Sequence, residues 1–310
     1  MTVLVVAASL GALAFALAWP VPVALSRASW PARSPAIAVA LWQAIALAGG
    51  LSMIGCLLAV GAAPAGSLLA AAAQLLPHLI AGPIPAGFGL VQLAALALAT
   101  LLAVHLSLNL ASTAVRAERE RRRQHQLIDV LSDPLPGQPH TRVLAHSVPF
   151  AYCVPGIRTA TVLTAGLVDA LDDDELAAVI AHERAHLDQF HHLVLLAFRA
   201  WHSALPWFPI ANRAERSVAW LTEMLADDRA RREVGADPLR RAIERVGSEG
   251  ELGAYADAGG VSPDAAMLAA RLARIGSDRG ELAFALRAAV VAASAALVAL
   301  PVAAMLGILR

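Results

Sequence analysis

The stretch Asp172-Asp-Asp-Glu-Leu-Ala-Ala-Val-Ile-Ala-His182-Glu183-Arg-Ala-His186 is the most informative part of this 310-residue sequence. Its acidic start predicts a helix that Asp172 caps, with Glu175 three residues further on. Residues four apart lie on one face of a helix, so His182 and His186 project side by side. Two neutral imidazoles so placed can bind Zn²⁺, and Glu183 can act as a general base toward a water molecule. The stretch therefore predicts a zinc site; the alternative is a solvated helical face that carries two histidines by chance.

A catalytic zinc ion needs three protein ligands and one open position. A second helix-like segment, Trp220-Leu-Thr-Glu223-Met-Leu-Ala-Asp227, places two carboxylates four residues apart on one face. We expect Glu223 to be the third ligand and Asp227 to accept a hydrogen bond from the outer nitrogen of a ligand histidine. An acidic helix surface is the alternative. Arg229 is a candidate stabiliser of the oxyanion that peptide hydrolysis would generate, although an exposed arginine is the simpler interpretation.

The remaining histidines lack ligand spacing. We expect His191 and His192 to continue the helix of His186, but five and six residues further on they fall off the ligand face. No metal binding is expected at the others, which are His78, His105, His125, His140, His146 and His202.

The composition indicates a membrane protein. The chain is 58% hydrophobic and only 15% charged, whereas about a quarter of the residues of a soluble domain are charged. The net charge of zero gives no reason to expect nucleic-acid binding. All basic residues other than histidine are arginines, which favours a bacterial source. The two cysteines, Cys56 and Cys153, predict neither a disulfide framework nor a metal site.

No charged residue occurs from Ser34 to Val115. Because about twenty apolar residues cross a bilayer, we predict four spans, near residues 2–24, 37–61, 89–113 and 288–308. The first span could be a signal peptide, but it lacks a basic start, so a retained helix is favoured. Residues 67–82 are also apolar, but they are short and contain Pro77, so we interpret them as an extracytoplasmic or re-entrant loop; a further span stays open.

The arginines predict the orientation of the chain. Arg27 and Arg33 lie between the first two spans, and a cluster that begins at Arg116 follows the third. Because cytoplasmic loops are rich in arginine, we expect the N-terminus outside and the zinc domain in the cytosol. The predicted domains of this multi-pass inner-membrane protein are a membrane domain at 1–115, a cytosolic domain at 116–287 and a last transmembrane helix at 288–310.

The cytosolic region is expected to be mainly α-helical, with a small sheet. Residues 116–130 predict a helix that continues the third span, and Asp133-Pro-Leu-Pro-Gly predicts a linker or turn after it. The runs Arg142–Cys153 and Thr159–Leu163 predict strands separated by Pro155-Gly156. An edge strand beside the zinc helix could pair with an extended substrate. The expected fold is an α-helical integral membrane protein with about four transmembrane helices and a small-sheet α+β zinc domain.

The apolar spans, the Pro-Gly turn, Thr-Ala-Gly-Leu before the helix, the H-E-x-x-H stretch and Glu223-x-x-Ala-Asp227 together resemble membrane gluzincin peptidases. The greatest similarity is to the BlaR/MecR-type peptidases of bacterial β-lactam signalling, in which three spans precede a cytosolic zinc domain and a fourth follows. The resemblance implies one Zn²⁺ held by His182, His186 and Glu223. It also implies general-base catalysis by Glu183 and a supporting role for Asp227. It further implies that the chain lies in a lipid bilayer and hydrolyses peptide bonds of a protein substrate, a cytosolic transcriptional repressor.

Other functions stay open. The sequence ends at Arg310 without a penicillin-binding domain or its serine motif, so direct β-lactam sensing is not expected. HtpX-like and CAAX-protease-like membrane peptidases share the zinc pattern, and they imply quality control or processing of membrane proteins. A membrane scaffold with a vestigial metal site is a non-catalytic alternative. A transporter is supported only by the apolar surroundings of His78 and His105.

Overall fold

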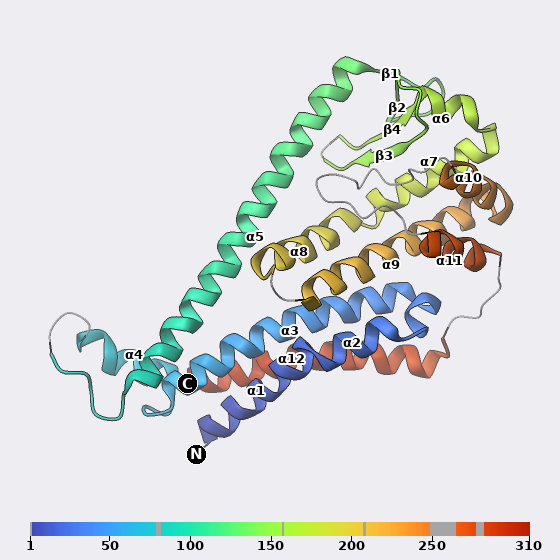
Figure 1. Ribbon diagram of the computed structural model, residues 1–310. Coiled ribbons are helices and arrows are strands. Elements are labelled where there is room, and N and C mark those ends of the chain that lie inside the picture. The colour runs from blue at the N-terminus through green and yellow to red at the C-terminus, as the bar shows by residue number, and fades with distance from the viewer. Residues whose placement is uncertain (1, 79–81, 157, 207–208, 249–264, 277–281) are drawn as a thin grey trace. The chain divides into compact units, whose positions relative to one another are not determined.

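The computed structural model describes residues 2–78, 82–156, 158–206, 209–248, 265–276 and 282–310 (Figure 1). Contacts divide the chain into two compact units. The first comprises Met1–Ala111, Ala200–Ser217 and Leu282–Arg310, and the second comprises Ser112–Arg199 and Val218–Glu281.

All regular elements in the described part of the first unit are helices. Its elements are α1 (Thr2–Ala18), α2 (Pro20–Arg27), η1 (Trp30–Arg33), α3 (Pro35–Ala62), α4 (Leu68–Leu75), η2 (Leu76–His78), the first part of α5 (Leu90–Leu131) and α12 (Phe284–Leu309). In the described ranges, four segments are long and apolar enough to cross a membrane: Val3–Arg27, Pro35–Ala62, Leu90–Leu131 and Phe284–Leu309. The prediction of four apolar helices is therefore confirmed.

The apolar segment between α3 and α5 does not reach the length of a span. Its helical part, Leu68–His78, is about 16 Å long at 1.5 Å per residue, about half the thickness of a bilayer core. The last residues of the predicted segment include 79–81, which lie outside the described part of the chain.

Helix α3 packs closely against α1 and α12. A Cβ atom on Gly55 would lie 3.0 Å from Leu10 of α1 and 3.1 Å from Met305 of α12, so glycine allows this close approach. His105 of α5 lies with its Nε2 atom 3.1 Å from the carbonyl oxygen of Ala204. This contact with the end of a helix accounts for His105 without a transport pathway.

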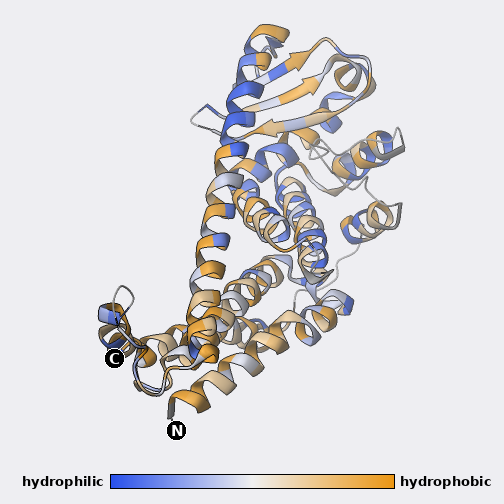
Figure 2. Cartoon of the chain, turned by 60° about the vertical axis from the view of Figure 1, so that its left-hand side comes forward, coloured by the Kyte–Doolittle hydropathy of each residue, from blue (hydrophilic) through white to orange (hydrophobic). Residues whose placement is uncertain are grey.

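Helix α5 is continuous over 42 residues, as the sequence predicts. Figure 2 shows apolar residues along its first part and hydrophilic residues along its second part. The second part carries Arg116, Arg119 and Arg121–Arg123.

The second unit contains a four-stranded sheet. The strands β1 (Ser132–Pro134), β2 (Thr141–Leu144), β3 (Ala151–Val154) and β4 (Ala160–Thr164) lie in the order β1-β2-β4-β3. Only β2 and β4 are parallel; the other two pairs are antiparallel. β3 is therefore an edge strand.

Two strand predictions need correction. The run Arg142–Cys153, predicted as one strand, forms β2 and β3 with residues 145–150 between them, because Pro149 and its neighbours interrupt the extended ladder. The segment Asp133-Pro-Leu-Pro-Gly, predicted as a linker or turn, begins instead as the short edge strand β1, which pairs with β2, and turns at residues 136–137. The strand predicted at Thr159–Leu163 is confirmed as β4.

Helices cover both faces of this sheet. Val154 and Val162 pack against Ile128 of α5, whereas Ala151 and Leu163 face the main core of the unit. That core is formed with α6 (Ala165–Ala170), α7 (Asp173–Asp188), α10 (Ala236–Ser248) and α11 (Ala265–Ile275). The remaining helices, α8 (His191–Ala204) and α9 (Pro209–Val234), each have residues in both units.

The predicted capping box begins α7. Asp172 accepts a hydrogen bond from the Glu175 backbone N–H at 2.9 Å, and its own N–H donates to the Glu175 carboxylate at 3.2 Å. Glu175 is fully buried, and its carboxylate lies 3.3 Å from Arg241 and 2.9 Å from Arg245 of α10. This cluster attaches α10 to the start of the helix that carries His182.

Candidate metal centre

Helix α7 buries the three residues that the sequence singles out. His182, Glu183 and His186 are at most 6% exposed. The face of α7 that carries the histidines meets α9, which contributes Glu223 and Asp227 from the same unit. Packing between two helices thus assembles residues that lie far apart in the sequence.

The spacing of the ligand atoms fits a zinc ion. The Nε2 atoms of His182 and His186 are 3.2 Å apart, and they lie 3.4 and 3.3 Å from the two carboxylate oxygens of Glu223. Ligands at about 2.0–2.1 Å from a tetrahedral zinc ion are roughly 3.3–3.4 Å apart. In the described part of the chain, these three side chains make up the group that could hold a metal ion. Two imidazoles and one carboxylate leave the fourth position open, as in catalytic zinc sites.

Asp227 lies behind the histidines. Its Oδ1 atom is 3.0 Å from Nδ1 of His182, on the side of the ring away from the ligand nitrogen. Asp227 is 2% exposed and accepts two hydrogen bonds from Arg271 of α11, at 2.8 and 2.7 Å. The same guanidinium reaches Glu223 at 3.3 Å. Arg271 therefore holds both carboxylates in place.

The histidines differ in their charge preference. Burial lowers the pKa of His182, but the carboxylates of Asp227 and Glu223 outweigh burial and raise it to about 10. Burial lowers the pKa of His186 to about 3, so that imidazole is neutral near pH 7. A histidine binds a metal through a neutral ring, so metal binding at this centre would release a proton from His182.

Glu183 lies next to the ligand histidines in sequence and is 6% exposed. Burial raises its pKa to about 7, although His182 and the Cys153 thiol of β3 lower it. A carboxylate with a pKa near the operating pH is well suited to accept and return a proton.

His191 lies at the site although its spacing did not predict this. It was expected on the same helix as His186, but α7 ends at Asp188 and α8 begins at His191. The turn between the helices brings Nδ1 of His191 to 3.0 Å from Nδ1 of His186. His191 is 2% exposed, and burial lowers its pKa to about 4. His191 thus contacts the Nδ1 atom of His186, as Asp227 contacts the Nδ1 atom of His182.

Arg229, the candidate oxyanion stabiliser, lies on a different face of α9 from Asp227. Arg229 is exposed and follows Asp227 by two residues, about 200° around the helix axis. Its role in catalysis stays a prediction. Arg271 was not singled out from the sequence, because no spacing rule connects an arginine on α11 with carboxylates on α9.

No curated protein and no solved structure matches the chain. The model of Peptidase family M48 matches residues 114–267, which include the two histidines, both carboxylates and Glu183. The match names neither the BlaR/MecR type nor the HtpX type. It agrees with the helical fold, the small sheet and the position of the candidate metal centre, and the chain therefore contains an M48 metallopeptidase domain.

Proposed function

We propose that the chain is a membrane-embedded zinc metalloendopeptidase that hydrolyses peptide bonds of a protein substrate. The observation that carries this proposal is the triangle of His182 Nε2, His186 Nε2 and Glu223, whose sides of 3.2–3.4 Å suit tetrahedral zinc. A structural zinc site would present a fourth protein ligand, usually cysteine. No fourth ligand joins this group in the described residues, which supports catalysis over a purely structural site.

Each residue of the centre has a defined task in this proposal. Zinc, when bound, supplies the Lewis acidity that polarises the scissile carbonyl and makes a water molecule acidic. Glu183 takes the proton of the attacking water and passes it to the leaving nitrogen. Asp227 orients His182 through Nδ1, which keeps the ligand nitrogen Nε2 directed toward the ion.

The position of the edge strand β3 favours a substrate that binds in an extended conformation. Residues Ala151–Val154 end the sheet, and Cys153 lies against Glu183. A substrate that adds main-chain hydrogen bonds to β3 would place its peptide bonds beside the general base.

For the cellular setting we propose the bacterial inner membrane, with the N-terminus outside and the peptidase domain in the cytosol. Four apolar helices support membrane insertion. The arginines before the second span and after the third support the orientation. A cytosolic transcriptional repressor is the proposed substrate, by resemblance to BlaR/MecR-type signalling peptidases.

The test compares new protein N-termini in cells that make the wild-type chain with those in cells that make Glu183→Gln. The variant should retain zinc and lose cleavage, because an amide cannot accept the proton. New N-termini on a DNA-binding repressor, present only with wild type, are the expected result. New N-termini on damaged membrane proteins would replace the repressor with a quality-control role. No difference under any envelope stress would overturn the proposed activity and favour a scaffold.

A further inference from the structure

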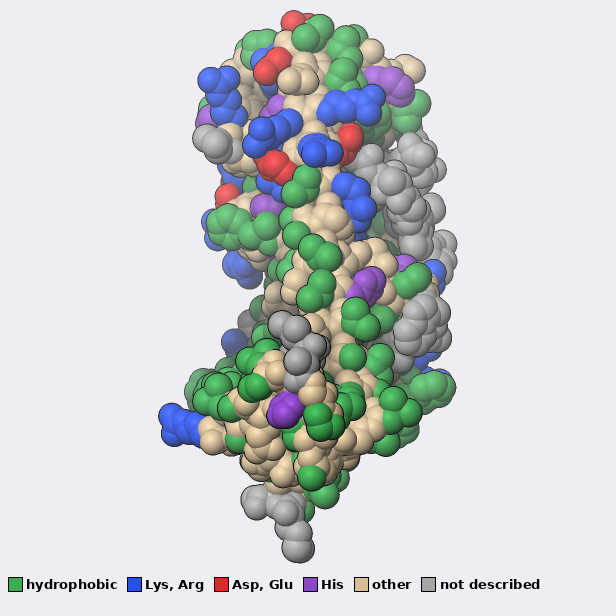
Figure 3. Space-filling model, turned by 90° about the vertical axis from the view of Figure 1, so that its left-hand side faces the viewer, with side chains coloured by type: hydrophobic (Ala, Val, Ile, Leu, Met, Phe, Trp, Pro, Cys, Tyr) green, Lys and Arg blue, Asp and Glu red, His purple; other side chains and the backbone are tan. Residues whose placement is uncertain are grey.

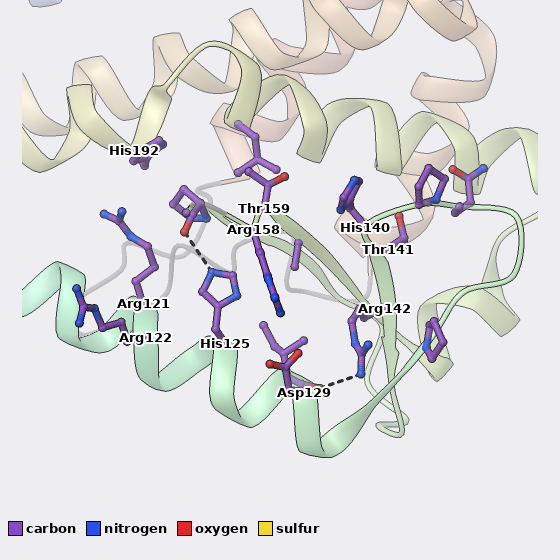
Figure 4. Close-up of a pocket in the computed structure, with 18 of the residues that line it drawn as sticks. Arg121, Arg122, His125, Asp129, His140, Thr141, Arg142, Arg158, Thr159 and His192 are labelled. Atoms are coloured by element: carbon purple, nitrogen blue, oxygen red, sulfur yellow. Dashed lines mark hydrogen bonds between the residues drawn. The ribbon is translucent and has the colours of Figure 1, made fainter.

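A large cleft lies in the second unit beside the candidate metal centre. Its volume is about 1290 Å³, above the roughly 300–1,000 Å³ typical of small-molecule pockets. Helix α5, the loop between β1 and β2, the described residues between β3 and β4, and the turn between α7 and α8 form its walls (Figure 4). We call it the arginine cleft, after Arg121, Arg122, Arg142 and Arg158, which line it.

Positive charge dominates the arginine cleft. Its four arginines face two carboxylates, Glu118 and Asp129. Glu118 is shared by Arg121 and Arg122, at 3.3 and 2.8 Å. Figure 3 shows the basic side chains that gather on the face of the second unit where α5 lies. The cleft is therefore complementary to an acidic ligand.

Within the described part of the chain, Arg142 and Arg158 have no carboxylate partner. Arg142 donates to Ser132 Oγ at 2.9 Å and to backbone carbonyls, which leaves its charge unneutralised. Arg158 is exposed and has no ion-pair or hydrogen-bond partner among the described residues. Its side chain extends from the β3–β4 turn toward α5 in Figure 4. Arg158 is thus free to bind an anion.

The walls of the cleft also carry apolar side chains and strained backbone. Phe190 is 61% exposed and Leu193 is 50% exposed. His140 and Phe190 are the two described non-glycine residues with positive φ, at 65° and 53°, and both line the cleft. Strained residues gather where a ligand is held. An occupant with both acidic and apolar side chains, such as a peptide, fits this lining.

Two elements lead from the metal centre into the cleft. On β3, Cys153 lies against Glu183, and Pro155, two residues or about 7 Å further on, lines the cleft. On α7, His186 is a candidate ligand, and Leu187 lines the cleft. An extended substrate along β3 advances about 3.3 Å per residue. Its side chains two to four residues from the scissile bond would reach the cleft.

We infer that the arginine cleft binds an acidic side chain of the peptide substrate, two to four residues from the bond that is cut, through Arg158. This inference rests on the proposed peptidase function and adds a substrate class to it. An acidic residue on one side of the scissile bond is then a determinant of specificity, whereas the hydrolytic step itself does not need Arg158.

The first experiment uses the full chain in neutral-lipid nanodiscs with zinc. A peptide library from a digested proteome is incubated with wild type, Arg158→Glu, Arg119→Glu and, as background, Glu183→Gln. Arg119 is the matched control because it is exposed on α5 and outside the cleft lining. Wild type and Arg119→Glu should cut sites enriched in Asp or Glu at one position two to four residues away. Arg158→Glu should lose this enrichment or replace it with Arg and Lys.

Kinetics then separate binding from hydrolysis. Two peptides differ by Asp or Asn at the enriched position. For wild type, the Asp peptide should have an about two- to fivefold lower KM with the same kcat, the range expected for an exposed ion pair. For Arg158→Glu, the ratio should fall to about one or invert. No acidic enrichment with wild type, or enrichment that survives Arg158→Glu, overturns the inference.

A binding measurement distinguishes failure of the inference from failure of the proposed function. If wild type cuts nothing that Glu183→Gln leaves intact, the peptidase proposal fails. Labelled peptides with one Asp, placed two to four residues from the centre on either side, are then titrated against Glu183→Gln by fluorescence anisotropy. Tighter binding than the Asn peptides, lost in Arg158→Glu, supports the acidic-ligand cleft. If Arg158→Glu changes only the binding to phosphatidylglycerol vesicles, the cleft binds a lipid headgroup and the inference is wrong.

Discussion

Arg271 of α11 makes a two-point ion pair with Asp227 of α9, with Nε and Nη2 at 2.8 and 2.7 Å from the two carboxylate oxygens. Both side chains are at most 5% exposed. Asp227 in turn lies 3.0 Å from His182. A residue beyond the segment that matches Peptidase family M48 thus supports a candidate zinc ligand.

Arg271→Ala should reduce both stability and zinc affinity. The substitution leaves Asp227 buried without its cation, a loss of about 3–5 kcal/mol. It also frees Asp227 and Glu223 to move, so zinc affinity should fall about 10- to 100-fold. Chelator competition measures the affinity, and thermal unfolding measures the stability.

Arg274→Ala is the matched control for Arg271→Ala. Arg274 joins the same two helices through Asp228, with Nη2 2.7 Å from its carboxylate. This substitution should destabilise the packing of α11 on α9 and leave zinc affinity unchanged. Equal zinc affinities for the two variants would show that Arg271 acts only through general stability.

His191→Phe should weaken zinc binding about tenfold with little loss of packing. A neutral His186 that binds zinc through Nε2 carries its proton on Nδ1, and His191 Nδ1 at 3.0 Å accepts it. Phenylalanine keeps the ring volume and removes the acceptor. Zinc titration of His192→Phe, the neighbouring histidine on α8, provides the comparison and should give the wild-type affinity. Unchanged affinity in His191→Phe would contradict a supporting role.

Peptide hydrolysis should fall as the pH decreases below about 7. Burial raises the pKa of Glu183 to about 7, and only its ionised form accepts a proton, so activity is present above this pKa and lost below it. A bound cation would lower this raised pKa, so the acid limb is expected at or somewhat below pH 7. The profile of kcat/KM from pH 5 to 9 tests this, with zinc occupancy measured at each pH. A constant rate across that range at full occupancy would contradict an acid limb near pH 7 from Glu183.

Glu175→Ala should destabilise the peptidase domain more than Glu175→Gln. Alanine removes the capping-box contact with the Asp172 N–H and the contacts with Arg241 and Arg245. Loss of such a cap costs about 0.5–2 kcal/mol, and loss of the contacts with Arg241 and Arg245 adds to it. Glutamine keeps an acceptor for the Asp172 N–H. Thermal unfolding should rank wild type above Gln and Gln above Ala, and identical midpoints would mean that the cluster adds no stability.

The sequence by itself determined the relationships that lie within one helix. A helix places residues four apart on one face whatever surrounds it, so His182 and His186, and likewise Glu223 and Asp227, could be paired from spacing alone. The capping box at Asp172 is equally local. The four apolar helices followed from composition and length, because a bilayer requires about twenty apolar residues.

Tertiary structure decided which of these local features meet. The 3.0 Å contact of His182 with Asp227 needs α7 and α9 to pack together, and the contact of Asp227 with Arg271 needs α11 to close on α9. The order β1-β2-β4-β3 depends on strand pairing across the chain. His191 reaches His186 only because α7 ends at Asp188 and the chain turns. Local spacing carries no information on such contacts, since burial and charge pairing between distant segments select them.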